Sequence, residues 1–321
     1  MKRSLLLAAL LSASSLCAYA QNAAQSLSFV VPYPAGGPLH TSAQLLADGA
    51  QQNLGNITVV NKPGAGGATG VEWVAKAKPQ DNLVVMGAVA THAVLPHLGN
   101  ALGYDIDKDF KPLLLVARVP NVLVMTKERA EQLKLQSTSD LVAYAKANPD
   151  TLKIGSAGKG SIGHIAGEMF KSLANLRMSN QLYEGASATQ KALLNGEVDM
   201  VFDNLASALP LIESGKLQAL SVTTLGRNVA LPKTPTMNDA VPGFDVTTWF
   251  GVFAPASLPD KDAQKYVQAF QTALSEPKYR AQYQKMGIAP EDMRLKEFSE
   301  FVKRENRKFQ FLISATKIKT R

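Results

Sequence analysis

The sequence predicts an α/β protein built from two lobes, each with a mostly parallel sheet flanked by helices. Short apolar runs alternate with segments whose apolar residues recur every three or four positions, which is typical of strands alternating with helices. With 321 residues, 46% of them hydrophobic and 19% charged, the chain can bury one large core or two smaller ones. The predicted strands are too many for one small sheet, and no long linker, repeat or low-complexity tract separates them. We therefore expect two lobes whose backbones cross more than once.

The predicted strands are short apolar runs, and they cover residues 27–31, 57–60, 83–86, 113–116, 122–125, 153–155, 198–202 and 219–222. Helical spacing is clearest at residues 42–52 and 162–173. From Pro259 onward no run reads as a strand. There we expect two or three helices, with breaks at residues 275–277 and 287–290, which contain proline or glycine.

The first twenty residues have the layout of a secretory signal peptide. Lys2 and Arg3 precede an apolar run at residues 5–11, and small residues end at Ala20, where we expect cleavage. The run is far shorter than the roughly 20 residues that a membrane span needs. We expect an exported protein that functions in the periplasm. Its predicted domains are a signal peptide at 1–20, one lobe from 21–117 and 224–321, and a second lobe at 118–223.

Charge and cysteine content limit the classes of partner. The only cysteine, Cys17, lies in the predicted signal, so the mature chain has no thiol for disulfides or metal binding. Removing Lys2 and Arg3 lowers the formal net charge from +8 to +6. This moderately basic balance suits anionic small molecules or an anionic membrane surface better than nucleic acid. The sequence indicates neither a metal site nor a cofactor.

Four loops each follow a predicted strand and precede a helix, and they cover residues 33–40, 61–70, 155–164 and 202–207. In the first, "YPAGGPLH", Gly36 and Gly37 allow positive φ and close approach of a ligand. Pro38 suits the first helical position, and the helix beyond it presents unpaired N–H groups at the positive end of its dipole. Such a loop can hold a carboxylate without a charged side chain. One such loop is usually a turn, but four at the carboxyl ends of strands indicate a ligand site.

The residue spacings do not match the motifs of nucleotide-binding or catalytic sites. Residues 64–70 lack the acidic partner of a dinucleotide site, and Gly160 stands where a phosphate-binding loop needs Ser or Thr. Ser161 and His164 lie three apart at a helix start, which leaves an exported enzyme acting on carboxylates as an alternative. The basic C-terminal segment is interleaved with phenylalanines. We expect an amphipathic helix docked on the body of the protein, with a membrane or nucleic-acid surface as the alternative.

Several segments resemble, in order and spacing, the Bug family of periplasmic receptors for tripartite tricarboxylate transporters. They include "FVVPYPAGGPLHTSAQLLA", "VVNKPGAGGATGVEWVAKAKP", "GSAGKGSIGHIAGEMFKSLA", "VDMVFDNLASALPLIESGKLQALSVTT" and "WFGVFAP". The resemblance implies a type II periplasmic binding fold that closes on a small carboxylate. It also implies a non-enzymatic monomer that delivers the ligand to membrane permease subunits or to a sensor protein, with no cofactor.

The resemblance also implies which residues contact the ligand. They lie in the four loops and beside them: Tyr33, Ala35, Gly36, Gly37, Pro38, Leu39, His40, Gly64, Ala65, Gly66, Gly67, Ala68, Thr91, Ser156, Ala157, Gly158, Ser161, His164, Asp203 and Asn204. His40 departs from the family pattern, which usually has aspartate there. Because histidine can donate, accept or become cationic, we expect this receptor to disfavour amino acids and to favour a more anionic or extended carboxylate. The alternative is that His40 only packs beside the pocket.

Overall fold

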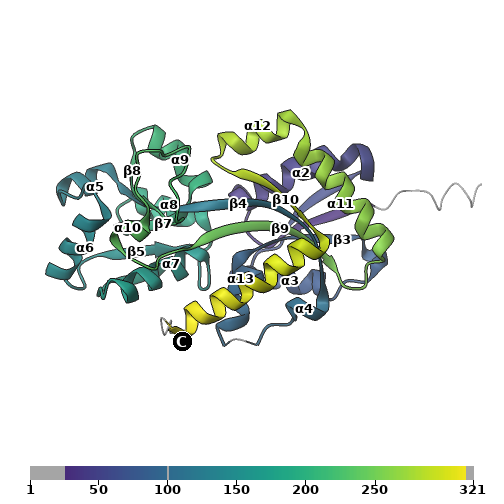
Figure 1. Ribbon diagram of the computed structural model, residues 1–321, viewed down its shortest axis with the longest axis horizontal. Helices are drawn as coiled ribbons and strands as arrows, with labels where there is room; N and C mark the ends of the chain where they lie inside the picture. The colour runs from purple at the N-terminus through teal and green to yellow at the C-terminus, as the bar shows by residue number, and fades with distance from the viewer. Residues whose placement is uncertain (1–25, 100, 316–321) are drawn as a thin grey trace, which may run out of the picture.

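One long strand, β4 (Phe110–Thr126), runs through both lobes of the computed structural model of this chain, which describes residues 26–99 and 101–315 (Figure 1). Its first part pairs with β9 (Thr247–Pro255) in the first lobe, and its last part pairs with β7 (Met200–Asn204) and β8 (Leu217–Val222) in the second. The predicted two-lobed α/β fold is confirmed. The predicted signal peptide and its cleavage after Ala20 lie outside the described residues.

The first lobe has the strand order β2-β1-β3-β9-β4, with β10 also paired to β4. β1 pairs in parallel with β2 and β3, whereas β9 and β10 are antiparallel to their neighbours. The strands not yet bounded are β1 (Leu27–Val31), β2 (Ile57–Asn61), β3 (Leu83–Ala88) and β10 (Ala289–Arg294). The α-helices are α2 (Pro38–Leu54), α3 (Ala68–Ala75), α4 (Ile106–Asp109), α11 (Asp260–Ser275), α12 (Pro277–Lys285) and α13 (Leu295–Ala315). They are joined by the short 3₁₀ helices η1 (Ala65–Gly67), η2 (Pro79–Asp81) and η4 (Leu95–His97) and by the π-helix η3 (Ala90–Val94).

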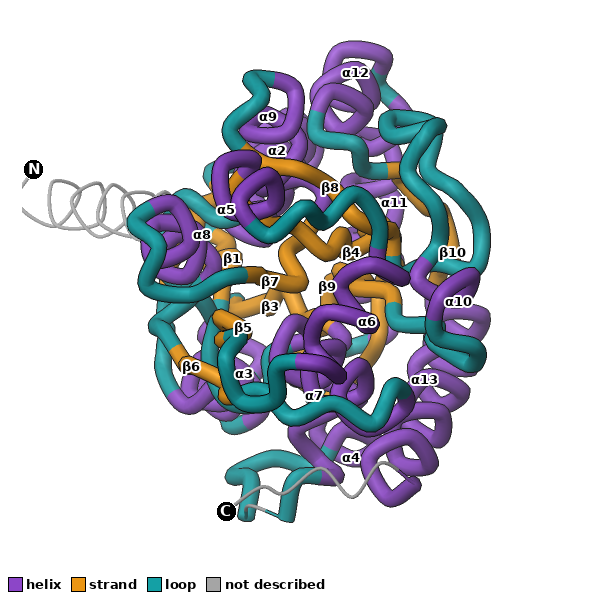
Figure 2. The backbone as a smooth tube through the Cα atoms, turned by 90° about the vertical axis from the view of Figure 1, so that its left-hand side faces the viewer, coloured by secondary structure: helices purple, strands orange, loops and turns teal. Residues whose placement is uncertain are grey.

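The second lobe places β5 between β6 and β7, all parallel, and joins them to β4 and β8. Its strands β5 (Lys153–Ser156) and β6 (Ser179–Leu182) accompany helices α5 (Lys127–Gln132), α6 (Thr138–Ala147), α7 (Ile162–Leu173), α8 (Ala186–Leu194), α9 (Leu205–Glu213) and α10 (Met237–Ala240). Figure 2 shows this lobe toward the viewer, with α7 on one side of β5 and β7 and with α8 and α9 on the other.

Alternation along β7 explains why helices cover both faces of its sheet. Met200 and Phe202 belong to the core cluster that includes α7, whereas Val201 belongs to the cluster that includes α8 and α9. Successive side chains of a strand point to opposite faces, so an apolar run needs a layer of helix on each side. The carboxyl ends of β5 and β7 are thereby held between two layers.

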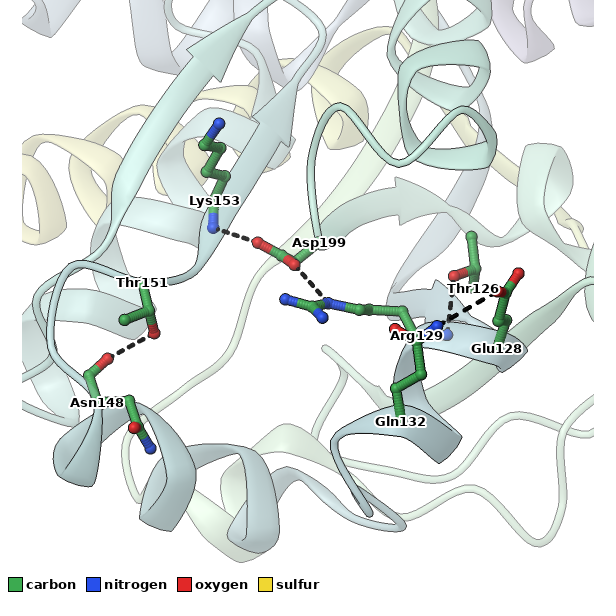
Figure 3. A network of polar contacts seen from close by, with 8 residues as sticks. All are labelled: Thr126, Glu128, Arg129, Gln132, Asn148, Thr151, Lys153 and Asp199. Carbon is green, nitrogen blue, oxygen red and sulfur yellow. Dashed lines mark hydrogen bonds and ion pairs between the residues drawn. The ribbon is translucent and has the colours of Figure 1, made fainter.

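Asp199 fixes the opposite ends of the same strands (Figure 3). One carboxylate oxygen accepts a hydrogen bond from Arg129 Nε at 2.8 Å, and the other accepts from the backbone N–H of Lys153 at 2.8 Å. The aspartate therefore ties α5 to the start of β5 just before β7 begins. Charge-assisted hydrogen bonds of this kind are stronger than neutral ones.

A buried polar cluster marks the crossing between the lobes. The N–H of Asn121, on β4, donates to Thr223 Oγ1 at 3.1 Å, and its side-chain amide donates to Thr248 Oγ1 at 2.9 Å. β4 pairs with β9 as far as Pro120 and with β7 from Asn121 onward. The cluster therefore lies where the strand changes its partners.

Three expectations need correction. Residues 113–116 and 122–125 belong to the single strand β4, because the chain stays extended through Pro120 by pairing with β9. The tail beyond Pro259 contains a strand, β10, which is polar and partly exposed and gives no apolar signal. The strands β6 and β9 were also not predicted from the apolar runs.

The predicted C-terminal amphipathic helix is confirmed as α13, which buries Phe298 and Phe309 completely.

Candidate functional site

A cavity of about 130 Å³ lies between the two lobes. The first lobe lines it with residues 33–35, 37–40, 88–90, 248 and 250. The second lobe lines it with residues 157, 161–163, 184–187, 189 and 201–204, and Asn121 of the crossing lies between them. The cavity therefore lies at the carboxyl ends of β1, β3, β5 and β7, the edge where α/β sheets bind ligands.

The first predicted loop lines this cavity at the start of α2. Gly37 is the residue before the helix and Pro38 is its first residue. The N–H groups of Leu39 and His40 therefore lie in the first turn, where a helix offers them no partner. His40 is among the residues that line the cavity, and its Nδ1 is buried without a hydrogen-bond partner. Of the predicted residues in this loop, only Gly36 does not line the cavity.

The second predicted loop is placed differently. Gly64, Ala65, Gly66, Gly67 and Ala68 do not line the cavity. Three of its amides are used within the loop, because the N–H groups of Gly67 and Thr69 donate to the Gly64 carbonyl oxygen and that of Ala68 donates to the Ala65 carbonyl oxygen. Tyr33 Oη also donates to the Gly66 carbonyl oxygen at 3.1 Å. The second loop therefore contacts Tyr33 of the first loop and does not line the cavity itself.

The third predicted loop contributes the start of α7. Ala157, Ser161, Ile162 and Gly163 line the cavity. Ser161 Oγ caps the helix by accepting from the N–H of His164 at 3.2 Å. His164 Nδ1 in turn accepts from the N–H of Gly160 at 3.2 Å, so this ring closes its own loop and does not contact Ser161 Oγ as a base would. The predicted residues Ser156, Gly158 and His164 are absent from the lining.

Asp203 and Asn204 line the cavity at the end of β7. Asp203 accepts hydrogen bonds from Gln190 Nε2 at 2.9 Å and from the Asn204 N–H at 2.8 Å. Burial nevertheless raises the pKa of the Asp203 carboxyl to about 7. Asn204 precedes α9 but does not cap it with its side chain, and its Oδ1 is buried without a partner.

Three further parts of the lining were not predicted from the sequence: the start of α8, the residues contributed by β4 and β9, and residues 88–90 at the end of β3. Gly185, Ala186 and Ser187 form the start of α8, and the strand before it, β6, is too polar to be recognised. A glycine between a strand and a helix was the signal that could have found it. Asn121, Thr248 and Phe250 reach the cavity only through the pairing of β4 with β9.

The electrostatics of the cavity come from backbone rather than from cations. Among the described residues, no lysine or arginine lines it, and the charged side chains that do are Glu184 and Asp203. The starts of α2, α7, α8 and α9 all border it. Each carries unpaired N–H groups and a partial positive charge, so the site favours an anion.

The two lobes touch beside the cavity. A Cβ atom on Gly66 would lie 2.8 Å from the carbonyl oxygen of Lys159, and one on Gly160 would lie 2.6 Å from Leu95 Cδ2. A Cβ atom on Gly185 would lie 3.5 Å from Pro34. The two lobes are therefore in contact beside the cavity in the described conformation.

The predicted site residue Thr91 lies away from the cavity, and so do His92 and His97. Thr91 is fully buried, and its Oγ1 lies 2.8 Å from His92 Nδ1 and 3.1 Å from the N–H of Ala88. The His92 ring stacks on Phe253 with 3.8 Å between the centroids. His97 Nε2 lies 2.7 Å from Asn306 Oδ1 on α13. Thr91 therefore supports the lining residue Ala88 from inside the core.

Comparisons with known proteins identify the family of this chain. A family model described as "Tripartite tricarboxylate transporter family receptor" matches residues 42–318. Protein BugT of Bordetella pertussis is 32% identical over 241 residues, which cover 74% of this chain and 73% of BugT.

Three solved structures superimpose over most of the chain. The periplasmic binding protein BugD has a TM-score of 0.85 at 28% identity, over 91% of this chain and 98% of BugD. The Rhodopseudomonas palustris proteins Rpa4515, solved with adipate, and MatC, solved with malate, each have a TM-score of 0.83 at 28% identity. The matches cover 91% of this chain and 97% of Rpa4515, and 90% of this chain and 98% of MatC. This chain belongs to the tripartite tricarboxylate transporter receptor family, whose members are periplasmic solute-binding receptors of the Bug type.

Proposed function

We propose that this protein binds a small dicarboxylate in the interlobe cavity and delivers it to the membrane permease of a tripartite tricarboxylate transporter. The observation that carries the proposal is an interlobe cavity bordered by four helix starts, with no lysine or arginine among its described lining residues. Two related structures of similar fold were solved with the dicarboxylates adipate and malate.

The binding energy that this arrangement offers is sufficient. A hydrogen bond to a charged group contributes about 1.5 to 3 kcal/mol, and a partly buried helix terminus adds up to about 2 kcal/mol. Three or four such contacts, less the cost of immobilising the ligand, reach the roughly −8 kcal/mol of a micromolar complex. Backbone amides at the starts of α2, α7 and α8 are the donors that we assign to the carboxylates.

We propose that the membrane partner recognises the closed arrangement of the two lobes. We propose that the lobes move about the cluster of Asn121, Thr223 and Thr248, with the chain crossing between the lobes near Asn121 on β4 and near Thr248 on β9. The support is the change of β4 partners at Asn121 and the place of α10, which precedes β9 in the chain and packs on α6 of the second lobe. A ligand that contacts both lobes favours the closed state, which the permease or a sensor protein recognises. We propose that the protein acts as an exported monomer.

An enzymatic function finds less support. Ser161 Oγ accepts from a backbone N–H, and His164 Nδ1 accepts from Gly160. No nucleophile and base are paired in that loop. Among the described residues, no helix is both long and apolar enough to cross a membrane, and no cluster of three or more possible metal ligands is present.

Thermal unfolding of the purified protein, refolded to remove bound ligand, tests the proposal. The panel contains monocarboxylates, dicarboxylates, tricarboxylates and acidic amino acids. A ligand at about 100 times its Kd stabilises the folded state by about 2.7 kcal/mol, which raises Tm clearly. A rise with dicarboxylates supports the proposal, and no rise with any carboxylate would refute it.

A further inference from the structure

The C-terminal helix α13 lies behind the strands that cross between the lobes, on the face opposite the cavity. Thr248 and Phe250 of β9 line the cavity, whereas Trp249 between them points to the other face, because successive side chains of a strand alternate. There the Trp249 ring packs against Phe301 of α13 with 5.5 Å between the centroids, and its Nε1–H donates to Glu305 at 3.1 Å. Helix and cavity therefore occupy opposite faces of the same strand.

α13 is attached to the first lobe over most of its length. It packs on β4, β10 and η3. Asn306 Oδ1 lies 2.7 Å from His97 Nε2 on η4, and Asn306 Nδ2 donates to the carbonyl oxygen of His92 on η3 at 3.3 Å. Both short helices follow β3 in the first lobe. The helix is therefore part of the first lobe at least as far as Asn306.

Two residues further on, α13 contacts the second lobe. Lys308 Nζ donates to Asp245 Oδ2 at 2.9 Å, in an ion pair that is half-buried. Asp245 belongs to the second lobe, because the ring of the preceding Phe244 stacks on Phe202 of β7 with 5.8 Å between the centroids, and because α10, just before it, packs on α6. Figure 1 shows α13 directed from the first lobe toward the second. The ion pair therefore spans the crossing.

We infer that α13 is a third connection between the lobes, beside β4 and β9, and that its Lys308–Asp245 ion pair raises ligand affinity by favouring the arrangement in which the lobes touch. Neither residue lines the cavity, so the pair acts without contacting the ligand. Because each lobe holds one member of the pair, a rotation of the lobes changes their separation. A contact made in the ligand-binding arrangement increases the population of that arrangement and thereby the apparent affinity. The inference rests on the proposed function in that the lobes close on a ligand.

Reversing one charge of the pair tests this inference. The probes are succinate, malate and adipate, titrated calorimetrically into the purified, refolded protein. In Lys308→Glu the attraction to Asp245 becomes repulsion, and we expect about five-fold weaker binding of every probe that the wild type binds. Adding Asp245→Lys to Lys308→Glu restores the attraction and should return each Kd to within about two-fold of the wild-type value. Lys76→Glu makes the same charge change in an ion pair with Glu72 of α3, and as the control it should bind like the wild type.

A second readout needs no ligand. We expect small-angle X-ray scattering of ligand-free Lys308→Glu to give a larger radius of gyration than the wild type and than the double variant, because its lobes are apart for more of the time. A role in folding alone would lower the free energy of unfolding, measured by urea titration. It would change neither the radius of the folded protein nor its Kd.

The outcomes separate this inference from the function on which it rests. The inference is wrong if either the Kd or the radius of gyration of Lys308→Glu stays at the wild-type value. It is also wrong if the double variant does not restore both, or if Lys76→Glu loses as much affinity. If the wild type binds none of the three probes, the dicarboxylate function fails and the radius alone decides. An unchanged radius then refutes the third connection, and an increase that the double variant reverses supports it.

Discussion

The two glycine-rich loops of the first lobe look alike in sequence and occupy different places. The loop at residues 33–40 lines the cavity, and a Cβ atom on Gly36 or Gly37 would meet nothing within 4 Å. The loop at residues 61–70 lies behind it, and a Cβ atom on Gly67 would lie 2.7 Å from Thr91 Cγ2. Gly37 leaves room beside the cavity in the first loop, whereas Gly67 allows close packing of the protein in the second. The same residue type therefore serves recognition in one loop and support in the other.

The largest expected effect comes from adding a methyl group to each loop. Gly67 and Gly36 both have positive φ, +101° and +85°, so alanine strains both backbones to a similar extent. Only Gly67→Ala also collides with Thr91 and Tyr33. We expect Gly67→Ala to lower the free energy of unfolding by about 3 kcal/mol and Gly36→Ala to lower it by about 1 kcal/mol. Urea titration measures both values, and equal losses would contradict the distinction between the loops.

A charge at the start of α2 should have the next largest effect, on ligand choice. His40→Asp places a carboxylate in the cavity beside the bound anion. We expect dicarboxylate affinity to fall about thirty-fold, which corresponds to about 2 kcal/mol, and acidic amino acids to gain affinity. Gln44→Asp adds the same charge to an exposed position of α2 and serves as the control. An unchanged ligand profile in His40→Asp would mean that His40 only packs beside the pocket.

A substitution in the loop at residues 61–70 should weaken ligand binding by destabilising the closed state. Gly66→Ala brings a methyl group to within 2.8 Å of the Lys159 carbonyl oxygen on the other lobe. We expect about ten-fold weaker dicarboxylate binding, because the methyl group destabilises the closed state by about 1.4 kcal/mol relative to the open state. Gly55→Ala, with φ of +79° and nothing within 4 Å, is the matched control for backbone strain. If the two variants bind the dicarboxylate equally tightly, the second loop does not contribute to the contact that stabilises the closed state.

The smallest expected effect is a pH dependence set by Asp203, on the wall opposite the first loop. Because its pKa lies near 7, Asp203 is largely protonated at pH 6 and ionised at pH 8. The ionised form repels a bound carboxylate, so affinity should fall as pH rises through 7. A repulsion of about 1 kcal/mol corresponds to about a five-fold change in Kd between these pH values. In Asp203→Asn the change should disappear, and a fall of the same size there would assign it to another group.

Sequence reasoning located the parts of this molecule that have local signals. Residues 27–31 and 162–173 match β1 and α7 in full, because apolar spacing and flanking turn residues define them. β6 and β10 are edge strands with polar side chains, so periodicity could not identify them. The start of α8 was missed together with β6, since a loop is recognised by the strand that precedes it.

The same limit applies to the site. The sequence indicated that the loop at 33–40 presents free amides, and the structure places that loop on the cavity. It could not indicate that the amides of Gly67 and Ala68 are used within their own loop. Nor could it place Asn121 and Thr248 at the crossing, because their neighbours are 102 and 127 residues away in the chain. Pairing between distant strands determines those positions.

The decisive experiment is a crystal structure of the complex with a bound dicarboxylate, either succinate or malate. We expect one carboxylate within hydrogen-bond distance, about 3 Å, of the N–H groups of Leu39 and His40, with no lysine or arginine in contact. The loop at residues 61–70 should keep its internal hydrogen bonds. If the amides of Gly66 or Ala68, or a cationic side chain, hold the carboxylate instead, anion binding by the start of α2 is wrong.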